Sequence, residues 1–121
     1  MNDAIREALI KGRTIDITTI GRESGQPRRK EIWFHNIDGT VYITGTPGKR
    51  DWYANLVAHP EFTFHLKQDV IADLPARATP VVDPAERRAI FARILSNLER
   101  GDDLEKWLEA SPLVSVEFPE K

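Results

Sequence analysis

Apolar and polar residues alternate along several short stretches of the chain, which is the pattern expected of β-strands with one buried face. Most of these stretches are rich in β-branched residues and end at Gly, Pro or Asp-Gly signals that are typical of turns. The first three are joined by short connections and predict an antiparallel meander. Pro75 and Pro80 indicate an edge, a bulge or a bend in the fifth. The six expected strands occupy residues 14–20, 28–37, 40–44, 61–67, 70–82 and 113–118.

Other segments place apolar residues at the three- to four-residue spacing of amphipathic helices. Asp3 and Asp51 stand where each would cap a helix, and the DPAE run that starts at Asp83 combines a cap, a first-turn proline and a glutamate. Gly101 is expected to end the third helix. Six strands with helices inserted among short hairpins favour an α+β fold built on a small antiparallel barrel over a parallel doubly wound sheet. The expected helices occupy residues 3–11, 52–59, 84–100 and a short segment around 104–108.

The chain has 121 residues, which predicts a single domain spanning residues 1–121. Hydrophobic residues make up 40% of it and charged residues 30%, as in a folded globular domain rather than a disordered chain. The formal net charge of −2 argues against general nucleic-acid binding, because that function needs a basic surface.

Cysteine is absent from the sequence, so disulfides, thiolate catalysis and Cys-ligated metals are excluded. His35, His59 and His65 lack a metal-ligand spacing such as H-x-x-x-H, and no Ser–His–acid signature is recognisable. No apolar run reaches the ~20 residues of a membrane span, and the first expected helix has no signal-peptide core. We therefore expect a cytoplasmic protein without a metal site.

Residues 21–30 (GRESGQPRRK), termed loop one below, connect the first two expected strands and carry four cations. Arg22, Ser24 and Arg28 could capture an anion, and two glycines would let the backbone approach a ligand closely. The alternative is an exposed hairpin whose charges are solvated.

Residues 44–50 (TGTPGKR), termed loop two, lead from the third expected strand to the second expected helix. Lys49 and Arg50 stand just before the helix start, where the macrodipole already favours an anion. The alternative is an ordinary strand-to-helix turn with surface cations. Two such loops in one small domain predict a phosphate-bearing ligand, because backbone N–H groups and cations can converge on it. The candidate ligand-binding residues here are Thr44, Gly45, Thr46, Pro47, Gly48, Lys49 and Arg50.

Four aromatic residues, Trp33, Tyr42, Trp52 and Tyr53, could form one wall of a site for a flat cofactor. Each is alternatively a residue of the core or of a dimer interface. Tyr42 and Tyr53 are the candidate proton donors, and no residue is assigned as catalytic.

The run ITTIGRESGQPR at residues 17–28 and the run WYANL at residues 52–56, closed by His59-Pro60, resemble the deazaflavin (F-420)-dependent nitroreductase family. That family belongs to the split β-barrel flavin-binding superfamily, which includes pyridoxamine-phosphate oxidase-like proteins. The resemblance extends over roughly residues 13–67, and beyond residue 70 only the order of elements matches. It implies a six-stranded FMN-binding split barrel with flanking helices.

The resemblance also implies a homodimer with the cofactor in a groove at the subunit interface. F-420 and FMN both remain candidate cofactors, because the loop before Trp52 is shorter than in mycobacterial nitroreductases and carries the charged run Lys49-Arg50-Asp51. The N-terminal extension is short as well. Besides the residues of loop two, the cofactor-binding positions that the resemblance implies are Gln26, Pro27, Arg28, Lys30, Trp52, Tyr53 and Asn55.

We therefore expect an oxidoreductase that moves a hydride between a bound flavin or deazaflavin and a small organic acceptor. A quinone, a nitro compound and an unsaturated carbonyl are all compatible acceptors. The alternative is a non-catalytic carrier on the same fold that holds a flavin, a haem-derived molecule or a lipid-like ligand.

Overall fold

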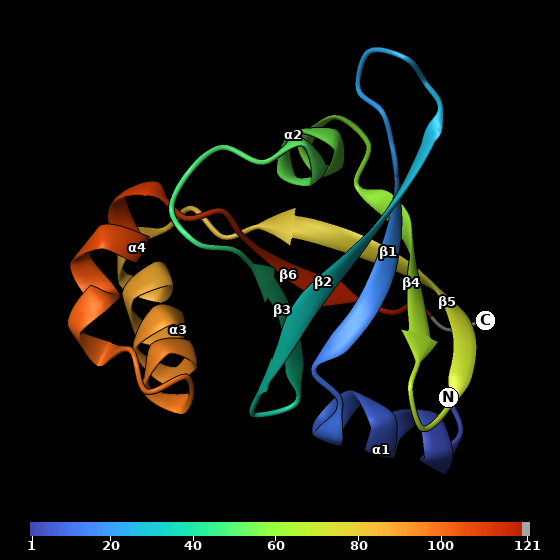
Figure 1. Ribbon diagram of the computed structural model, residues 1–121, viewed down its shortest axis with the longest axis horizontal. Helices are drawn as coiled ribbons and strands as arrows, with labels where there is room; N and C mark the ends of the chain where they lie inside the picture. The colour runs from blue at the N-terminus through green and yellow to red at the C-terminus, as the bar shows by residue number, and fades with distance from the viewer. Residues whose placement is uncertain (120–121) are drawn as a thin grey trace.

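The computed structural model, which describes residues 1–119, contains six antiparallel strands that close into a barrel (Figure 1). The strands follow the order β1-β2-β3-β6-β5-β4 around the barrel, and β4 pairs with β1 to close it. This confirms the α+β fold and the six-stranded antiparallel barrel expected from the sequence. The strands are β1 (Thr14–Ile20), β2 (Pro27–Ile37), β3 (Thr40–Thr44), β4 (Glu61–Lys67), β5 (Ile71–Pro80) and β6 (Leu113–Glu117).

The two prolines of β5 lie in a strand that changes partners along its length. Residues 71–77 pair with β4, whereas residues 77–80 pair with β6. Pro75 therefore stands where β5 has a neighbour on one side only, and Pro80 is the last residue of the strand. A residue without a backbone N–H is tolerated at such positions, which explains why the prolines do not break the strand.

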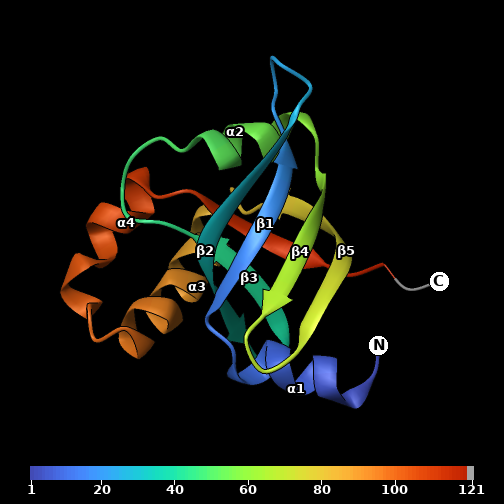
Figure 2. The same cartoon turned by 45° about the vertical axis from the view of Figure 1, so that its right-hand side comes forward.

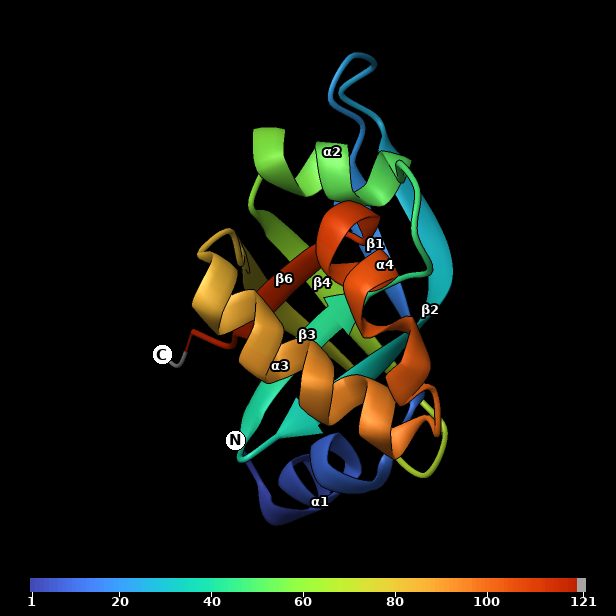
Figure 3. The ribbon, with the colours of Figure 1, turned by 90° about the vertical axis from the view of Figure 1, so that its left-hand side faces the viewer.

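Four helices and a short 3₁₀ turn surround the barrel (Figures 1 and 2). α1 lies at one end of the barrel and α2 crosses the other end, while α3 and α4 pack together against one side (Figure 3). Within residues 1–119, none of the helices combines the length and the apolar character needed to cross a membrane. The elements are α1 (Asp3–Lys11), α2 (Asp51–Ala58), α3 (Pro84–Asn97), η1 (Gly101–Asp103) and α4 (Leu104–Ala110).

Two of the expected helix caps were misplaced by one residue. Asn2, not Asp3, caps α1, because its side-chain oxygen accepts the Ile5 N–H at 2.8 Å. Arg50 occupies the cap position of α2 without a side-chain bond, and Asp51 is the first helical residue. Asp3 and Asp51 therefore favour their helices through the macrodipole rather than through capping bonds.

The third helix starts as expected and ends earlier than expected. The Asp83 side chain accepts the Glu86 N–H at 2.9 Å, as the DPAE run predicts. The helix stops at Asn97, and Glu99 adopts a left-handed backbone angle (φ 58°) before the η1 turn begins at Gly101. The chain thus reverses direction before the glycine rather than at it.

The hydrophobic core has two parts. Inside the barrel, the rings of Phe34 and Phe64 meet edge to face with centroids 5.4 Å apart. Outside it, Phe91 of α3 and Trp107 of α4 pack with Ile37 against the barrel wall. The second part anchors the helical pair α3 and α4 to the barrel.

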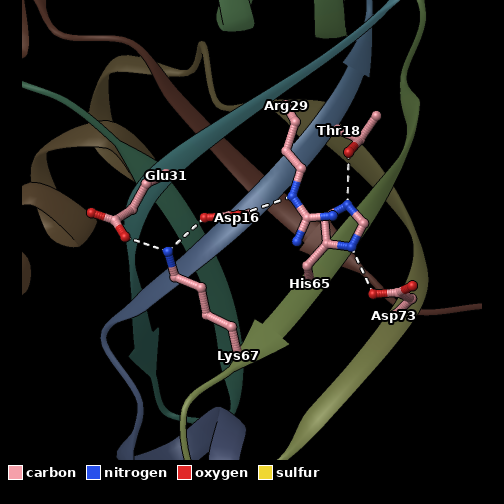
Figure 4. A network of polar contacts seen from close by, with 7 residues as sticks. All are labelled: Asp16, Thr18, Arg29, Glu31, His65, Lys67 and Asp73. Carbon is pink, nitrogen blue, oxygen red and sulfur yellow. Dashed lines mark hydrogen bonds and ion pairs between the residues drawn. The ribbon is translucent and has the colours of Figure 1, made fainter.

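The outer face of β1, β2 and β4 carries a polar network (Figure 4). Asp16 accepts hydrogen bonds from Arg29 at 2.9 Å and from Lys67 at 2.7 Å, and Lys67 also pairs with Glu31. These bonds hold the pKa of Asp16 below its usual value and raise the pKa of Lys67. The network therefore links three strands through pairs of opposite charge.

His35 of β2 is expected to make stability depend on pH. Burial, with a smaller contribution from the charge of Arg13, lowers its pKa from 6.5 to about 4. Its neutral form stabilises the folded state above pH 6.5, and this stability is lost as the pH falls toward 4. This pKa shift contributes about 3 kcal/mol to the free energy of unfolding at neutral pH.

We expect His35→Gln to unfold in urea with a smaller fall in free energy between pH 7 and pH 4 than the unchanged protein. The control is His59→Gln, because His59 is exposed after α2. Equal pH dependence in both variants would show that His35 is not the group responsible.

Candidate functional site

An open pocket of about 770 Å³ lies between loop one, the end of β1 and the start of α2. Its apolar lining includes Ile17 and Trp52. Six cationic and only two acidic residues line it, in a chain whose net charge is −2. The lining of the pocket therefore carries an excess of positive charge, which suits an anionic ligand. The charged lining residues are Arg22, Glu23, Arg28, Arg29, Lys30, Lys49, Arg50 and Asp51.

The pairing of β1 with β2 places two of the cations. Thr19 pairs with Arg28 and Ile17 pairs with Lys30, so these side chains share one face of the hairpin. The hairpin projects beyond the barrel next to α2 (Figures 1 and 2). Within residues 1–119, the side chains of Arg28, Lys30 and Lys49 make no hydrogen bond or ion pair and are exposed. Among residues 1–119, these three cations thus face the pocket without an ion-pair partner.

Asn55 of α2 connects loop one to the barrel. Its side-chain oxygen accepts the Arg22 N–H at 3.0 Å and the Arg22 Nη1 at 3.3 Å, while its Nδ2 donates to Thr19 Oγ1 at 3.2 Å. Asn55 and Thr19 are buried, and Arg22 also approaches Asp51 at 3.5 Å. The amide of Asn55 is therefore committed to protein groups, and it fixes the position of Arg22 in the pocket wall.

Arg50 organises loop two from within. Its Nη2 donates to Thr46 O at 2.9 Å and to Thr46 Oγ1 at 2.7 Å, and its Nη1 donates to Lys49 O at 3.0 Å. The guanidinium thus folds back over the loop that carries it. Arg50 lines the pocket, but its donors stabilise the loop, whereas the side chain of Lys49 beside it makes none of these bonds.

Thr44 and Gly48 of loop two are attached to residues 110–112, where α4 ends and the chain leads into β6. The hydroxyl of buried Thr44 donates to Pro112 O, and the Gly48 N–H donates to Ala110 O at 3.0 Å. Gly48 has φ 132°, a conformation that favours glycine. The position of Lys49 therefore depends on the α4–β6 segment as well as on the loop.

The structure brings together some of the expected ligand-binding residues and separates others. The pocket is lined by the expected residues Arg28, Lys30, Lys49, Arg50, Trp52 and Asn55. The remaining expected residues lie outside its lining: Gln26, Pro27, Thr44, Gly45, Thr46, Pro47, Gly48 and Tyr53. Several of these still shape it, because Thr46 holds Arg50 and Tyr53 packs edge-on against Trp52 with centroids 6.1 Å apart.

Sequence reasoning named loop one as an anion site but did not select Ile17, Thr19 or Arg29 as lining residues. The strand register is the signal that could have found Ile17 and Thr19, but not Arg29, which pairs with Thr18 on the other face of the hairpin. Once the turn of loop one is placed, Thr19 must lie opposite Arg28 and Ile17 opposite Lys30.

A hydrogen-bonded series of a hydroxyl, an imidazole and a carboxylate joins Thr18, His65 and Asp73 (Figure 4). No Ser–His–acid signature in the sequence had indicated it. Thr18 Oγ1 lies 2.7 Å from His65 Nε2, and Asp73 Oδ1 lies 2.7 Å from His65 Nδ1. None of the three lines the pocket. We assign the chain a structural role, because it satisfies both ring nitrogens of a buried histidine.

Comparison with known proteins extends over almost the whole chain. The model of a family described as F420H(2)-dependent quinone reductase matches residues 3–118. This match confirms the resemblance to deazaflavin-dependent reductases.

Solved structures also share the fold. A conserved hypothetical protein from Mycobacterium tuberculosis has a TM-score of 0.78 at 20% identity, and the match covers 99% of this chain and 82% of that one. A putative pyridoxamine 5'-phosphate oxidase from Listeria innocua has a TM-score of 0.73 at 13% identity, covering 98% and 93%. A structure described as an F420-H2 dependent reductase has a TM-score of 0.63 at 21% identity, covering 88% and 95%. These likenesses confirm the split-barrel fold.

Proposed function

We propose that this chain, which belongs to the F420H(2)-dependent quinone reductase family, transfers a hydride from the reduced deazaflavin to a quinone. The observation that carries the proposal is that the family match includes both loops of the cationic pocket. The fold neighbour described as an F420-H2 dependent reductase supports the same cofactor.

The residues present fit a phosphate-bearing cofactor. Arg28, Lys30 and Lys49 are exposed cations whose side chains have no partner among the described residues, and they face one open pocket next to the start of α2. We assign them the binding of the cofactor phosphate, with charge-assisted hydrogen bonds. FMN remains the second candidate because it carries a phosphate as well.

The cofactor supplies the hydride chemistry when it is bound, and the protein supplies orientation and electrostatics. Asn55 and Arg22 keep loop one close to α2, while Arg50 keeps Lys49 at the pocket edge. Buried Trp52 supplies an apolar surface at the pocket wall. No side chain is assigned a proton-transfer step.

We also propose a homodimer in which a second copy covers the open side of the pocket. Loop one projects beyond the barrel with its residues 22–30 exposed, and Trp33 of β2 is 49% exposed. A hydride donor is protected from water when its site is enclosed, and one copy leaves this pocket open. Sedimentation of the purified protein with and without cofactor measures the assembly.

The test is a fluorescence titration of the purified protein with F420 and, in parallel, with FMN. We expect F420 to bind, and Lys49→Ala to weaken that binding about 10- to 150-fold, since one charge-assisted bond is worth about 1.5–3 kcal/mol. The control is Lys106→Ala, because Lys106 is an exposed lysine of α4 that does not line the pocket.

Turnover separates the enzyme from the carrier alternative. Reduced F420 bound to the protein should be oxidised when a benzoquinone is added. Binding of F420 without its oxidation would favour the carrier alternative. Tight binding of FMN but not of F420 would show that FMN is the cofactor. Equal affinities of both lysine variants would place the phosphate elsewhere.

A further inference from the structure

The helical pair α3 and α4 lies beside the barrel, yet its junction with β6 touches loop two (Figures 1 and 3). We term residues 110–112 the α4–β6 corner. Ala110 O accepts the Gly48 N–H at 3.0 Å, and Pro112 O accepts the Thr44 hydroxyl. Both attachments of loop two to this corner are made to backbone carbonyls, so the loop follows the path of the corner backbone.

Arg87 of α3 holds this corner in place. Its Nη2 donates to Leu108 O at 3.1 Å and to Ser111 O at 2.8 Å, and its Nη1 donates to Val81 O at 3.0 Å. Its guanidinium also lies over the Phe91 ring, 5.1 Å from the centroid. The last carbonyls of a helix have no partner within the helix, and a planar guanidinium can serve several of them at once.

Besides Arg87, the Ser111 N–H, which donates to Trp107 O at 2.9 Å, and the burial of Ser111 and Pro112 restrain the corner. The Ser111 hydroxyl is buried and has no hydrogen-bond partner within residues 1–119. α4 is only seven residues long, which is too short to be stable without tertiary contacts. The contacts of Arg87 with Leu108 and Ser111 are therefore major polar restraints on the end of the helix.

We propose that Arg87 is a positioning residue for loop two: it acts through the α4–β6 corner to fix Gly48 and so Lys49 at the pocket. Coupling of this kind runs through contiguous hydrogen bonds, and each step from Arg87 to Ser111, Ala110 and Gly48 is present. The effect on ligand binding rests on the proposed function, whereas the effect on loop two does not.

The experiment compares Arg87→Met with Arg88→Ala. Arg88 is the next residue of α3 and also joins it to α4, through an exposed ion pair with Glu105 at 3.1 Å. Amide hydrogen exchange followed by NMR should show Gly48 exchanging about tenfold or more faster in Arg87→Met, while Ile43 in the barrel is unchanged. Arg88→Ala should leave the exchange rates of both amides unchanged. Arg87→Lys, which keeps the charge but loses the planar fork, should give an intermediate rate.

Faster exchange of Gly48 alone supports the positioning role. Unchanged exchange at Gly48, or an equal increase at Gly48 and Ile43, overturns it, because the residue would then be inert or would stabilise the whole fold. Should Arg87→Met fail to fold, the same comparison is made with Arg87→Lys. F420 affinity is measured on the same samples: faster Gly48 exchange with unchanged affinity would retain the positioning role and contradict the proposed phosphate site.

Discussion

Replacing Asn55 with leucine is expected to lower both the stability of the protein and its affinity for the proposed cofactor. The side chains are similar in size, but leucine leaves the Arg22 N–H and the buried Thr19 hydroxyl without their partner. An unsatisfied buried polar group costs about 1–3 kcal/mol, so we expect the free energy of unfolding to fall by about 2–4 kcal/mol. Release of Arg22 should also weaken F420 binding about tenfold or more.

The aspartate variant separates these two effects. In Asn55→Asp the carboxylate keeps both bonds to Arg22, and the Thr19 hydroxyl can rotate to donate to it. Stability should therefore stay near that of the unchanged protein. The added negative charge faces the pocket proposed to bind the cofactor phosphate, so cofactor affinity should still fall.

Urea unfolding and fluorescence titration measure the two quantities, and Asn97→Leu is the control because Asn97 is exposed at the end of α3. If the leucine variant loses stability but binds F420 normally, loop one takes no part in the site. If it keeps full stability, the hydrogen bonds of Asn55 do not hold the loop.

The sequence predicts the barrel well because each strand carries its own evidence. Alternation in β1, for example, assigns Ile15, Ile17 and Thr19 to one face, and all three are buried. Turn chemistry then fixes the order of pairing: Asp38 and Gly39 have left-handed angles, φ 53° and 92°, in the hairpin between β2 and β3. Local signals are sufficient where neighbours in sequence are also neighbours in space.

The site is predicted less completely because its geometry depends on contacts between distant residues. A basic loop sequence cannot show that the guanidinium of Arg50 turns back to Thr46 while the Lys49 side chain has no partner in the part of the chain that the structure describes. Nor can it show that the side-chain oxygen of Asn55 accepts a hydrogen bond from Arg22, which lies 33 residues earlier. The sequence points to the residue types of the candidate site, but the division between residues that face the pocket and residues that hold the loops required the structure.

Two glycines of loop two, which differ in backbone conformation, test whether the geometry of this loop sets the position of Lys49. A Cβ on Gly48 would lie 2.9 Å from Arg50 Nη1, and its φ of 132° strains any other residue. A Cβ on Gly45 would meet Arg50 Nε at an ordinary 3.5 Å. We therefore expect Gly48→Ala to displace Arg50 or to rotate the Gly48 N–H away from Ala110, and Gly45→Ala to do neither.

The expected cost of Gly48→Ala is about 1–3 kcal/mol of unfolding free energy, the usual range for a strained backbone angle. F420 affinity should fall about tenfold or more, because Lys49 moves with the loop and a charge-assisted bond is lost. Gly45→Ala should change neither quantity appreciably. Equal losses in both variants would mean that loop two tolerates no side chain at all, and unchanged affinity in Gly48→Ala would mean that its geometry does not set the position of the cation that binds the phosphate.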